Sequence, residues 1–173
     1  MTVAVIIYGT KSMEGIATVL RRLHIPYKLY YPNEIPNEHH SHIILSGGPK
    51  HVYDSDIQVP AWIINSPSPV LGICFGMQLI AKTFGGVIKR LEQKEEGMID
   101  VIELINNEQI IRQRYMNRYD YIYSLPDNFT ITGITKNNCI ATFTDYNKWW
   151  CVQYHPESNN AIDVELFRRF LSK

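Results

Sequence analysis

Cys74 lies between two glycines in the segment Gly72-Ile73-Cys74-Phe75-Gly76, which places one glycine two positions before it and one two positions after it. This spacing is the thiol form of a nucleophile elbow, a sharp turn from a buried strand into a helix that exposes the nucleophile. Side chains at the two flanking positions would clash in such a turn. Free N–H groups at the start of the following helix favour a thiolate. The alternative is a buried core cysteine, the usual environment of an isolated cysteine.

A base for this thiol is available in the segment Gln153-Tyr154-His155-Pro156-Glu157, at the end of an expected strand. A cysteine nucleophile needs an imidazole, and the imidazole needs an acceptor that orients it. Glu157 could accept the second ring N–H of His155, although a histidine near a glutamate is, on its own, more often structural. The other histidines have no acid at a fixed offset and are expected to be solvated: His24, His39, His40, His42 and His51.

The segment Ser46-Gly47-Gly48-Pro49 follows the expected strand His42–Leu45. Two glycines leave its backbone N–H groups unobstructed, so the turn could donate to the oxygen that becomes negative in acyl transfer. The same residues also suit an ordinary turn. Ligand sites in doubly wound sheets lie beyond the carboxyl ends of the strands, and all three segments fall at such ends. Their convergence predicts a single active site.

The first half of the chain alternates short apolar runs with helical patterns, which indicates a parallel sheet covered by helices. The expected strands are Val3–Ile7, Tyr27–Tyr30, His42–Leu45 and Val70–Ile73. The expected helical segments are Ser12–Leu23 with Ser12 as its N-cap, a turn at Ala61–Asn65, and Gly76–Phe84 ended by Gly85-Gly86.

The second half shows strand patterns until a closing helix. The expected strands are Met98–Ile105, Gln109–Arg112, Phe129–Thr135, Cys139–Phe143 and Trp150–Gln153, and the helix is Ile162–Leu171. We therefore expect an α/β fold with a mostly parallel central sheet, helices on both faces and a small antiparallel extension that rejoins the sheet near Trp150.

Composition fits one domain over residues 1–173, with 45% hydrophobic and 20% charged residues. Lys+Arg and Asp+Glu both number 17, which argues against nucleic-acid binding or a basic membrane-binding face. No apolar run is long enough to span a bilayer, and the N-terminus has no signal-peptide pattern. The three cysteines match no zinc spacing, so a reducing cytoplasm is expected, with Cys139 and Cys151 packed in the core.

Taken together, the three segments resemble the class I, or triad, glutamine amidotransferases over essentially the whole chain. The resemblance implies a flavodoxin-like fold and hydrolysis of the side-chain amide of L-glutamine to glutamate and ammonia, without a metal or cofactor. It implies a triad of Cys74, His155 and Glu157, which forms a thioester, and an oxyanion hole from the N–H groups of Gly48 and Phe75. Further substrate-binding candidates are Gly47, Gln78, Asn117, Arg118 and Tyr119.

Within the family, the chain resembles most the amidotransferase branch that serves GMP synthetases, and so purine biosynthesis. Arg118 and Tyr119 depart from that branch, and the pair could instead match the anthranilate synthase amidotransferases. The implied partner is an ATP-dependent synthetase of the ATP-pyrophosphatase type, docked on loops Gly47–Val52 and Met116–Tyr121 with Arg118 as a contact. The alternatives are a stand-alone hydrolase of γ-glutamyl amides or peptides and a catalytically idle binding subunit.

Overall fold

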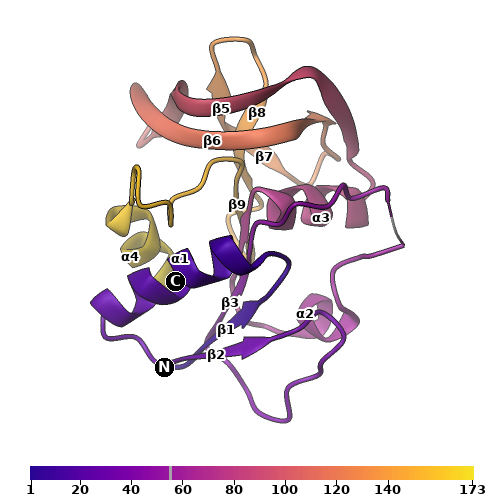
Figure 1. The fold of residues 1–173 in the computed structure, drawn as a ribbon, viewed down its shortest axis with the longest axis vertical. Coiled ribbons are helices and arrows are strands. Elements are labelled where there is room, and N and C mark those ends of the chain that lie inside the picture. The colour runs from indigo at the N-terminus through magenta and orange to yellow at the C-terminus, as the bar shows by residue number, and fades with distance from the viewer. Residues whose placement is uncertain (55) are drawn as a thin grey trace.

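The computed structural model describes residues 1–54 and 56–173 (Figure 1). In chain order its elements are β1 (Val3–Ile6), α1 (Thr10–Arg22), β2 (Tyr27–Tyr30), β3 (His42–Leu45), α2 (Ala61–Asn65), β4 (Val70–Ile73), α3 (Phe75–Thr83), β5 (Val87–Ile105), β6 (Glu108–Ser124), β7 (Thr130–Thr135), β8 (Ile140–Thr144), β9 (Trp149–Val152) and α4 (Val164–Leu171). Within these described ranges no helix is both long and apolar enough to cross a membrane.

The strands form one mixed sheet in the order β2-β1-β3-β4-β9-β8-β7-β5-β6. The pairings are parallel from β2 to β9 and antiparallel from β9 to β6. The α/β class is confirmed, and the chain returns to the parallel strands at β9 as expected. The sheet is mixed rather than mostly parallel, however, because its antiparallel part has as many strand pairings as its parallel part.

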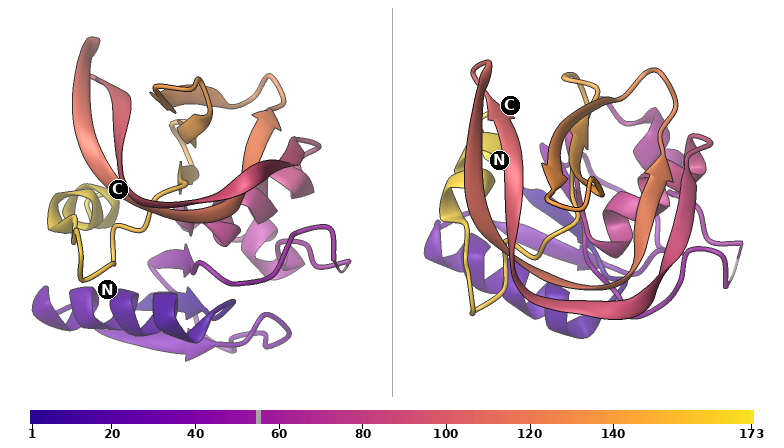
Figure 2. Two further views of the ribbon diagram at one scale, coloured as in Figure 1. Left: turned by 45° about the horizontal axis from the view of Figure 1, so that its top comes forward. Right: turned by 90° about the horizontal axis from the view of Figure 1, so that it is seen from above.

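The antiparallel part is also much larger than the small extension that we expected. β5 has 19 residues and β6 has 17, and they pair from Val87 with Ser124 to Ile105 with Glu108. They form a long curved hairpin, the β5–β6 arm, along the top of the molecule (Figures 1 and 2). The sequence prediction placed a loop at Met116–Tyr121, which lies inside β6. The loop prediction failed because backbone hydrogen bonds between β5 and β6 form this ladder. The many charged side chains of β5 leave no alternation of apolar and polar residues from which a strand could be predicted.

Two buried clusters lie against the parallel strands. One contains Val3 and Val5 of β1 with side chains of α1 and α4, and the other contains Ala4 and Ile6 with side chains of α2 and α3. Alternate residues of a strand point to opposite faces, which is why neighbours in β1 enter different clusters. In Figure 1, α1 and α4 lie to the left of these strands and α3 lies to the right.

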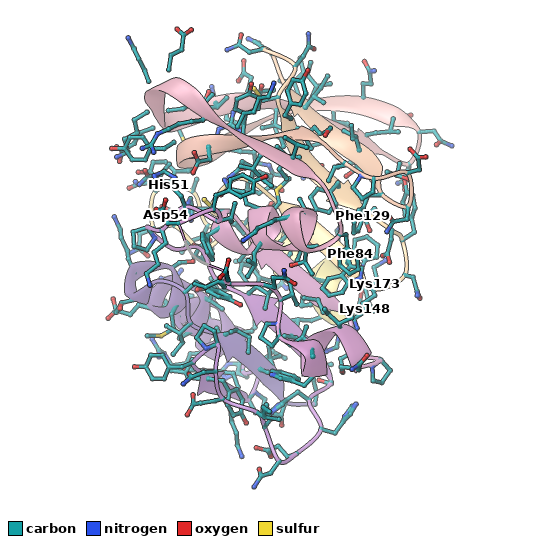
Figure 3. The ribbon with its side chains drawn as sticks, turned by 90° about the vertical axis from the view of Figure 1, so that its right-hand side faces the viewer. His51, Asp54, Phe84, Phe129, Lys148 and Lys173 are labelled. Atoms are coloured by element: carbon teal, nitrogen blue, oxygen red, sulfur yellow. The ribbon has the colours of Figure 1, made fainter. Side chains whose placement is uncertain are left out.

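The far end of α3 is fixed by aromatic contacts of Phe84, the C-cap of the helix, to Phe129 just before β7 and to Trp149 of β9. The Phe84 ring makes edge contacts with Phe129 and Trp149, with centroids 5.6 and 5.2 Å apart, and Figure 3 shows Phe84 and Phe129 side by side. Gly85, with φ of +92°, adopts the left-handed conformation that ends the helix, as predicted. Because Cys74 is the N-cap of α3, these contacts fix the direction of the helix that follows the candidate nucleophile.

Candidate active site

The turn at Cys74 has the geometry of a nucleophile elbow. Cys74 is the N-cap of α3 and has φ of +49°, a strained backbone conformation for a residue with a side chain. A Cβ on Gly72 would lie 2.6 Å from Ile80 Cδ1, and a Cβ on Gly76 would lie 2.4 Å from the Leu45 carbonyl oxygen. Close packing against backbone therefore requires glycine at position 76, while at Gly72 the nearest contact is the end of the Ile80 side chain and the nearest backbone atoms lie at 3.0 Å.

The Cys74 side chain lies among groups from β6 and from the segment after β9. Its Sγ lies 3.8 Å from the Asn117 carbonyl oxygen and 3.5 Å from Gln153 Nε2, whose amide N–H donates to it. Gln78 Nε2 in turn donates to Gln153 Oε1 at 3.2 Å and to the Asp120 carbonyl oxygen at 3.3 Å. The sequence prediction missed Gln153, although it lies in the same segment as His155. The sequence prediction assigned Gln78 a substrate-binding role, whereas its amide nitrogen already donates to two protein acceptors.

His155 and Glu157 are joined by a hydrogen bond, as expected from their spacing. His155 Nδ1 lies 2.9 Å from Glu157 Oε1, and Glu157 is only 3% exposed. Burial lowers the pKa of His155, but Cys74 and Glu157 together outweigh burial and raise it to about 11. The ring therefore keeps its proton at neutral pH, which suits a group that must protonate a leaving amine.

Ser12 joins this pair, contrary to its predicted role as a helix cap. The N-cap of α1 is Gly9, which offers no side-chain hydrogen bond. The Ser12 hydroxyl instead donates to Glu157 Oε1 at 2.6 Å and accepts from the Gly47 N–H at 2.9 Å. No local pattern could reveal this contact, because 145 residues separate Ser12 from Glu157.

The Ser46-Gly47-Gly48-Pro49 turn packs between β1 and His155. A Cβ on Gly47 would lie 2.9 Å from His155 Cε1, and one on Gly48 would lie 2.6 Å from the Tyr8 carbonyl oxygen. The Gly47 N–H is taken by Ser12. Across the described residues, the N–H groups of Gly48 and Phe75 have no protein acceptor. The two predicted oxyanion donors are thus free of protein acceptors, as such a role would require.

A cavity of about 850 Å³ brings most of the predicted site together. It is lined by Cys74, His155, Glu157, Gly47, Gly48, Gln78, Asn117, Arg118 and Tyr119, and also by Ser12. Of the predicted site residues only Phe75, whose proposed contribution is a backbone N–H, is not part of the lining. The cavity opens between α1, the Ser46 turn and the β5–β6 arm.

Arg118 is not the exposed rim cation that we expected. It is 3% exposed, and its Nε donates to Glu95 Oε2 at 2.6 Å across the β5–β6 arm. Its Nη1 is buried without a protein partner in the described part of the chain. The prediction was wrong because position 118 lies in a strand, where alternation places its side chain on the inner face, opposite to that of the exposed Tyr119.

Three of the histidines expected to be solvated have protein partners. His40 and His42 are buried: Tyr30 Oη lies 2.9 Å from His40 Nε2, and the His42 ring contacts Phe170. His51 Nδ1 pairs with Asp120 on β6, and Figure 3 shows His51 near the β5–β6 arm. Asp120 is distant in sequence from His51, and Tyr30 and Phe170 are not acids, so a test for a nearby acid could not find these partners.

The other two cysteines differ from Cys74 in their surroundings. Cys151 is buried in β9, and burial raises its thiol pKa well above the usual range, which confirms the predicted core role. Cys139 is half-buried and precedes β8 rather than lying in a strand, so that part of the prediction was wrong. Neither lines the cavity that contains Cys74.

The family model for "Glutamine amidotransferase class-I" matches residues 5–173 of this chain. The chain belongs to the class I glutamine amidotransferases. This confirms the family predicted from the three motifs, and with it the glutamine amidotransferase activity.

Curated relatives of this amidotransferase include two glutamine-hydrolysing GMP synthases. The one from Petrotoga mobilis is 31% identical over 98% of the chain, and the one from Borrelia garinii is 35% identical over 99%. The chain spans 35% of the length of each.

Among solved structures, a GMP synthase subunit from Thermoplasma acidophilum matches with a TM-score of 0.85 and 22% identity, over 99% of this chain and 92% of that one. PurLQS from Thermotoga maritima matches with a TM-score of 0.80 and 14% identity, over 99% and 97%. At these identities the two structures support the fold of the amidotransferase.

The elbow makes a prediction about stability. Gly76→Ala should lower the free energy of unfolding by about 1–3 kcal/mol, because the added methyl group meets the Leu45 backbone. Helix propensity alone favours alanine by roughly 0.5–1 kcal/mol, so the two effects have opposite signs. Chemical denaturation of the amidotransferase and the variant measures the difference. A variant as stable as the parent would show that the clash is relieved elsewhere.

The Cys74–His155 interaction makes a prediction about titration. Cys74→Ala should lower the pKa of His155 below about 11, because it removes the leading contribution that raises it and leaves the opposing effect of burial. NMR titration of the His155 ring protons measures this change. Cys139→Ala is the matched control and should leave the titration unchanged. Equal pKa values in Cys74→Ala and the parent protein would show that the two groups do not interact.

Proposed function

We propose that Cys74, His155 and Glu157 form the catalytic triad that hydrolyses the side-chain amide of L-glutamine. The observation that carries the proposal is the cavity in which a thiol on a strained elbow meets a buried His–Glu pair. The flavodoxin-like core that the family resemblance implies, with helices on both faces, agrees with the two buried clusters against the parallel strands.

In the first half of the reaction, the Cys74 thiolate attacks the amide carbon of glutamine. A C–S bond forms, and the carbonyl oxygen becomes negative within reach of the N–H groups that we assign to Gly48 and Phe75. His155 gives its ring proton to the amide nitrogen, and the C–N bond breaks to release ammonia and leave a thioester.

In the second half, the neutral His155 ring takes a proton from water, which attacks the thioester carbon. The C–S bond then breaks, so that glutamate leaves and the thiolate is restored beside the imidazolium. Glu157 accepts the other ring N–H throughout, which fixes the tautomer and stabilises the charged ring.

The amino-acid end of glutamine is proposed to lie toward the β5–β6 arm. Asn117, Arg118 and Tyr119 line that side of the cavity, while Gly47 and Gln78 line the other parts. Arg118 fits this assignment through a cationic side chain whose Nη1 has no protein partner within the described residues. Gln78 would contribute its carbonyl oxygen, since its amide nitrogen is engaged.

The ammonia acceptor is proposed to be a synthetase of the ATP-pyrophosphatase type in a cytoplasmic, GMP synthase-like system. Two observations support this. The two curated relatives described above are GMP synthases, and this chain spans about a third of their length. The remaining two thirds of those proteins lie outside the matched region, which supports an acceptor site outside these 173 residues.

The triad assignment predicts the effect of removing each thiol. Cys74→Ala should reduce glutamine hydrolysis by about 10⁴-fold or more, because no other thiol among the described residues lines the cavity. Cys139→Ala and Cys151→Ala should keep most of the parent kcat. Ammonia release measures all three variants. An electrophilic glutamine analogue should label Cys74 alone, and equal labelling of Cys139 would contradict the assignment.

The partner assignment predicts a change in rate on docking. Glutamine hydrolysis should be weak for the chain alone and should rise when the ATP-pyrophosphatase part of a GMP synthase is added, because docking would order the cavity rim. The assay is glutamate formation with and without that partner, with Cys74→Ala as the background control. Full activity alone, unchanged by the partner, would favour the stand-alone γ-glutamyl hydrolase.

A further inference from the structure

We propose that Ser12 is a positioning residue that joins the carboxylate of Glu157 to the Gly47 peptide, so that the acid–base pair and the oxyanion turn move as one unit. The inference rests on the proposed function, because it gives Ser12 a task within that same site. It assigns Ser12 no direct contact with the reacting atoms.

The hydrogen bonds of Ser12 supply the geometry. Its hydroxyl donates to Glu157 Oε1 at 2.6 Å and accepts from the Gly47 N–H at 2.9 Å. Ser12 is 8% exposed, so water can hardly replace either partner. His155 Nδ1 lies on the same carboxylate oxygen at 2.9 Å. One hydroxyl thus lies between the group that orients His155 and the turn that carries the Gly48 N–H.

The packing of α1 keeps Ser12 in this place. Gly15, one turn further along α1, lies so close to Glu157 that an added Cβ would be 2.7 Å from Glu157 Cγ. Gly47 lies equally close to the ring of His155, with an added Cβ 2.9 Å from Cε1. Glycines on both sides therefore let three chain segments approach closely enough for a single serine to connect them.

In the described part of the chain, Glu157 and Gly47 have no substitute for this contact. Glu157 Oε2 is buried without a protein partner there, so Ser12 and His155 supply the side-chain donors to this carboxylate. Loss of the hydroxyl would leave the buried carboxylate with His155 as its side-chain donor and the Gly47 N–H without an acceptor. The Ser46–Gly47 peptide group would then lose its anchor, and the backbone leading to the Gly48 N–H could change conformation, since glycine permits many backbone conformations.

The expected consequence is a loss in kcat rather than in substrate binding. The Ser12 hydrogen bonds support Glu157, which stabilises the charged His155 ring, and the turn that carries the Gly48 N–H. In the transition state the charge on the ring changes and negative charge develops on the substrate oxygen, so losing these bonds raises the barrier to the chemical step. Ser12→Ala should reduce kcat by about 10- to 100-fold, a range set by the strength of one hydrogen bond to a charged group. KM for glutamine should stay within about threefold of the parent value.

The experiment compares four variants of the full chain in glutamine hydrolysis, with thermal unfolding as a check of folding. Ser12→Ala removes the hydroxyl, Ser12→Cys retains a weak donor of similar size, and Ser12→Thr retains the hydroxyl. Ser172→Ala is the matched control, because it removes the same hydroxyl from a serine that does not line the cavity and that donates to the Arg169 carbonyl oxygen. We expect kcat to follow the order Ser172→Ala, Ser12→Thr, Ser12→Cys, Ser12→Ala, from highest to lowest.

A second readout does not depend on turnover. In a Cys74→Ala background, Ser12→Ala should raise the pKa of His155 measured by NMR, because Glu157 loses a donor and its charge acts more fully on the ring. A folded Ser12→Ala protein with unchanged kcat and unchanged His155 titration would overturn the proposal. A parent protein that stays inactive even with the ATP-pyrophosphatase partner added would instead overturn the proposed function, and the titration would still decide the role of Ser12.

Discussion

The parallel pairing of β4 with β3 on one side and β9 on the other determines where chemistry can take place in this protein. The Ser46 turn follows β3, Cys74 follows β4, and the His155 segment follows β9. Since parallel strands end at the same edge, three segments from distant parts of the chain emerge side by side. The left-handed backbone at Cys74 then turns the thiol toward that edge, and Gly76 permits this turn because a side chain there would meet the Leu45 backbone.

Within this arrangement, electrostatics and packing act together. Burial by itself would favour a neutral His155, yet Cys74 and Glu157 raise its pKa to about 11 and keep the ring protonated. The carboxylate that does so is itself buried, and donors must offset the cost of removing it from water. Ser12 and His155 supply those donors, which is why the first helix belongs to the site as much as the strand ends do.

The β5–β6 arm adds the remaining wall of the cavity. It brings the Asn117 carbonyl oxygen close to the Cys74 thiol, and its Tyr115 carbonyl oxygen accepts a hydrogen bond from the backbone N–H of His155. It also places Arg118 on its inner face. The arm can form with many charged side chains, because hydrogen bonds between its two strands pair the backbone N–H and carbonyl groups without a hydrophobic core. The arm therefore differs in sequence character from the rest of the sheet while still fixing one side of the site.

The sequence by itself determined the features that depend on local geometry. The glycines around Cys74, the His155–Glu157 spacing and the apolar runs of β1, β3 and β4 each follow from short-range sterics or periodicity, and all were predicted. Only the tertiary structure decided the contacts between distant segments. The length of the β5–β6 arm, the burial of Arg118, the partner of His51 and the place of Ser12 depend on which backbone or side chain lies opposite. That choice is made by pairing and packing across the whole chain, and no window of neighbouring residues contains it.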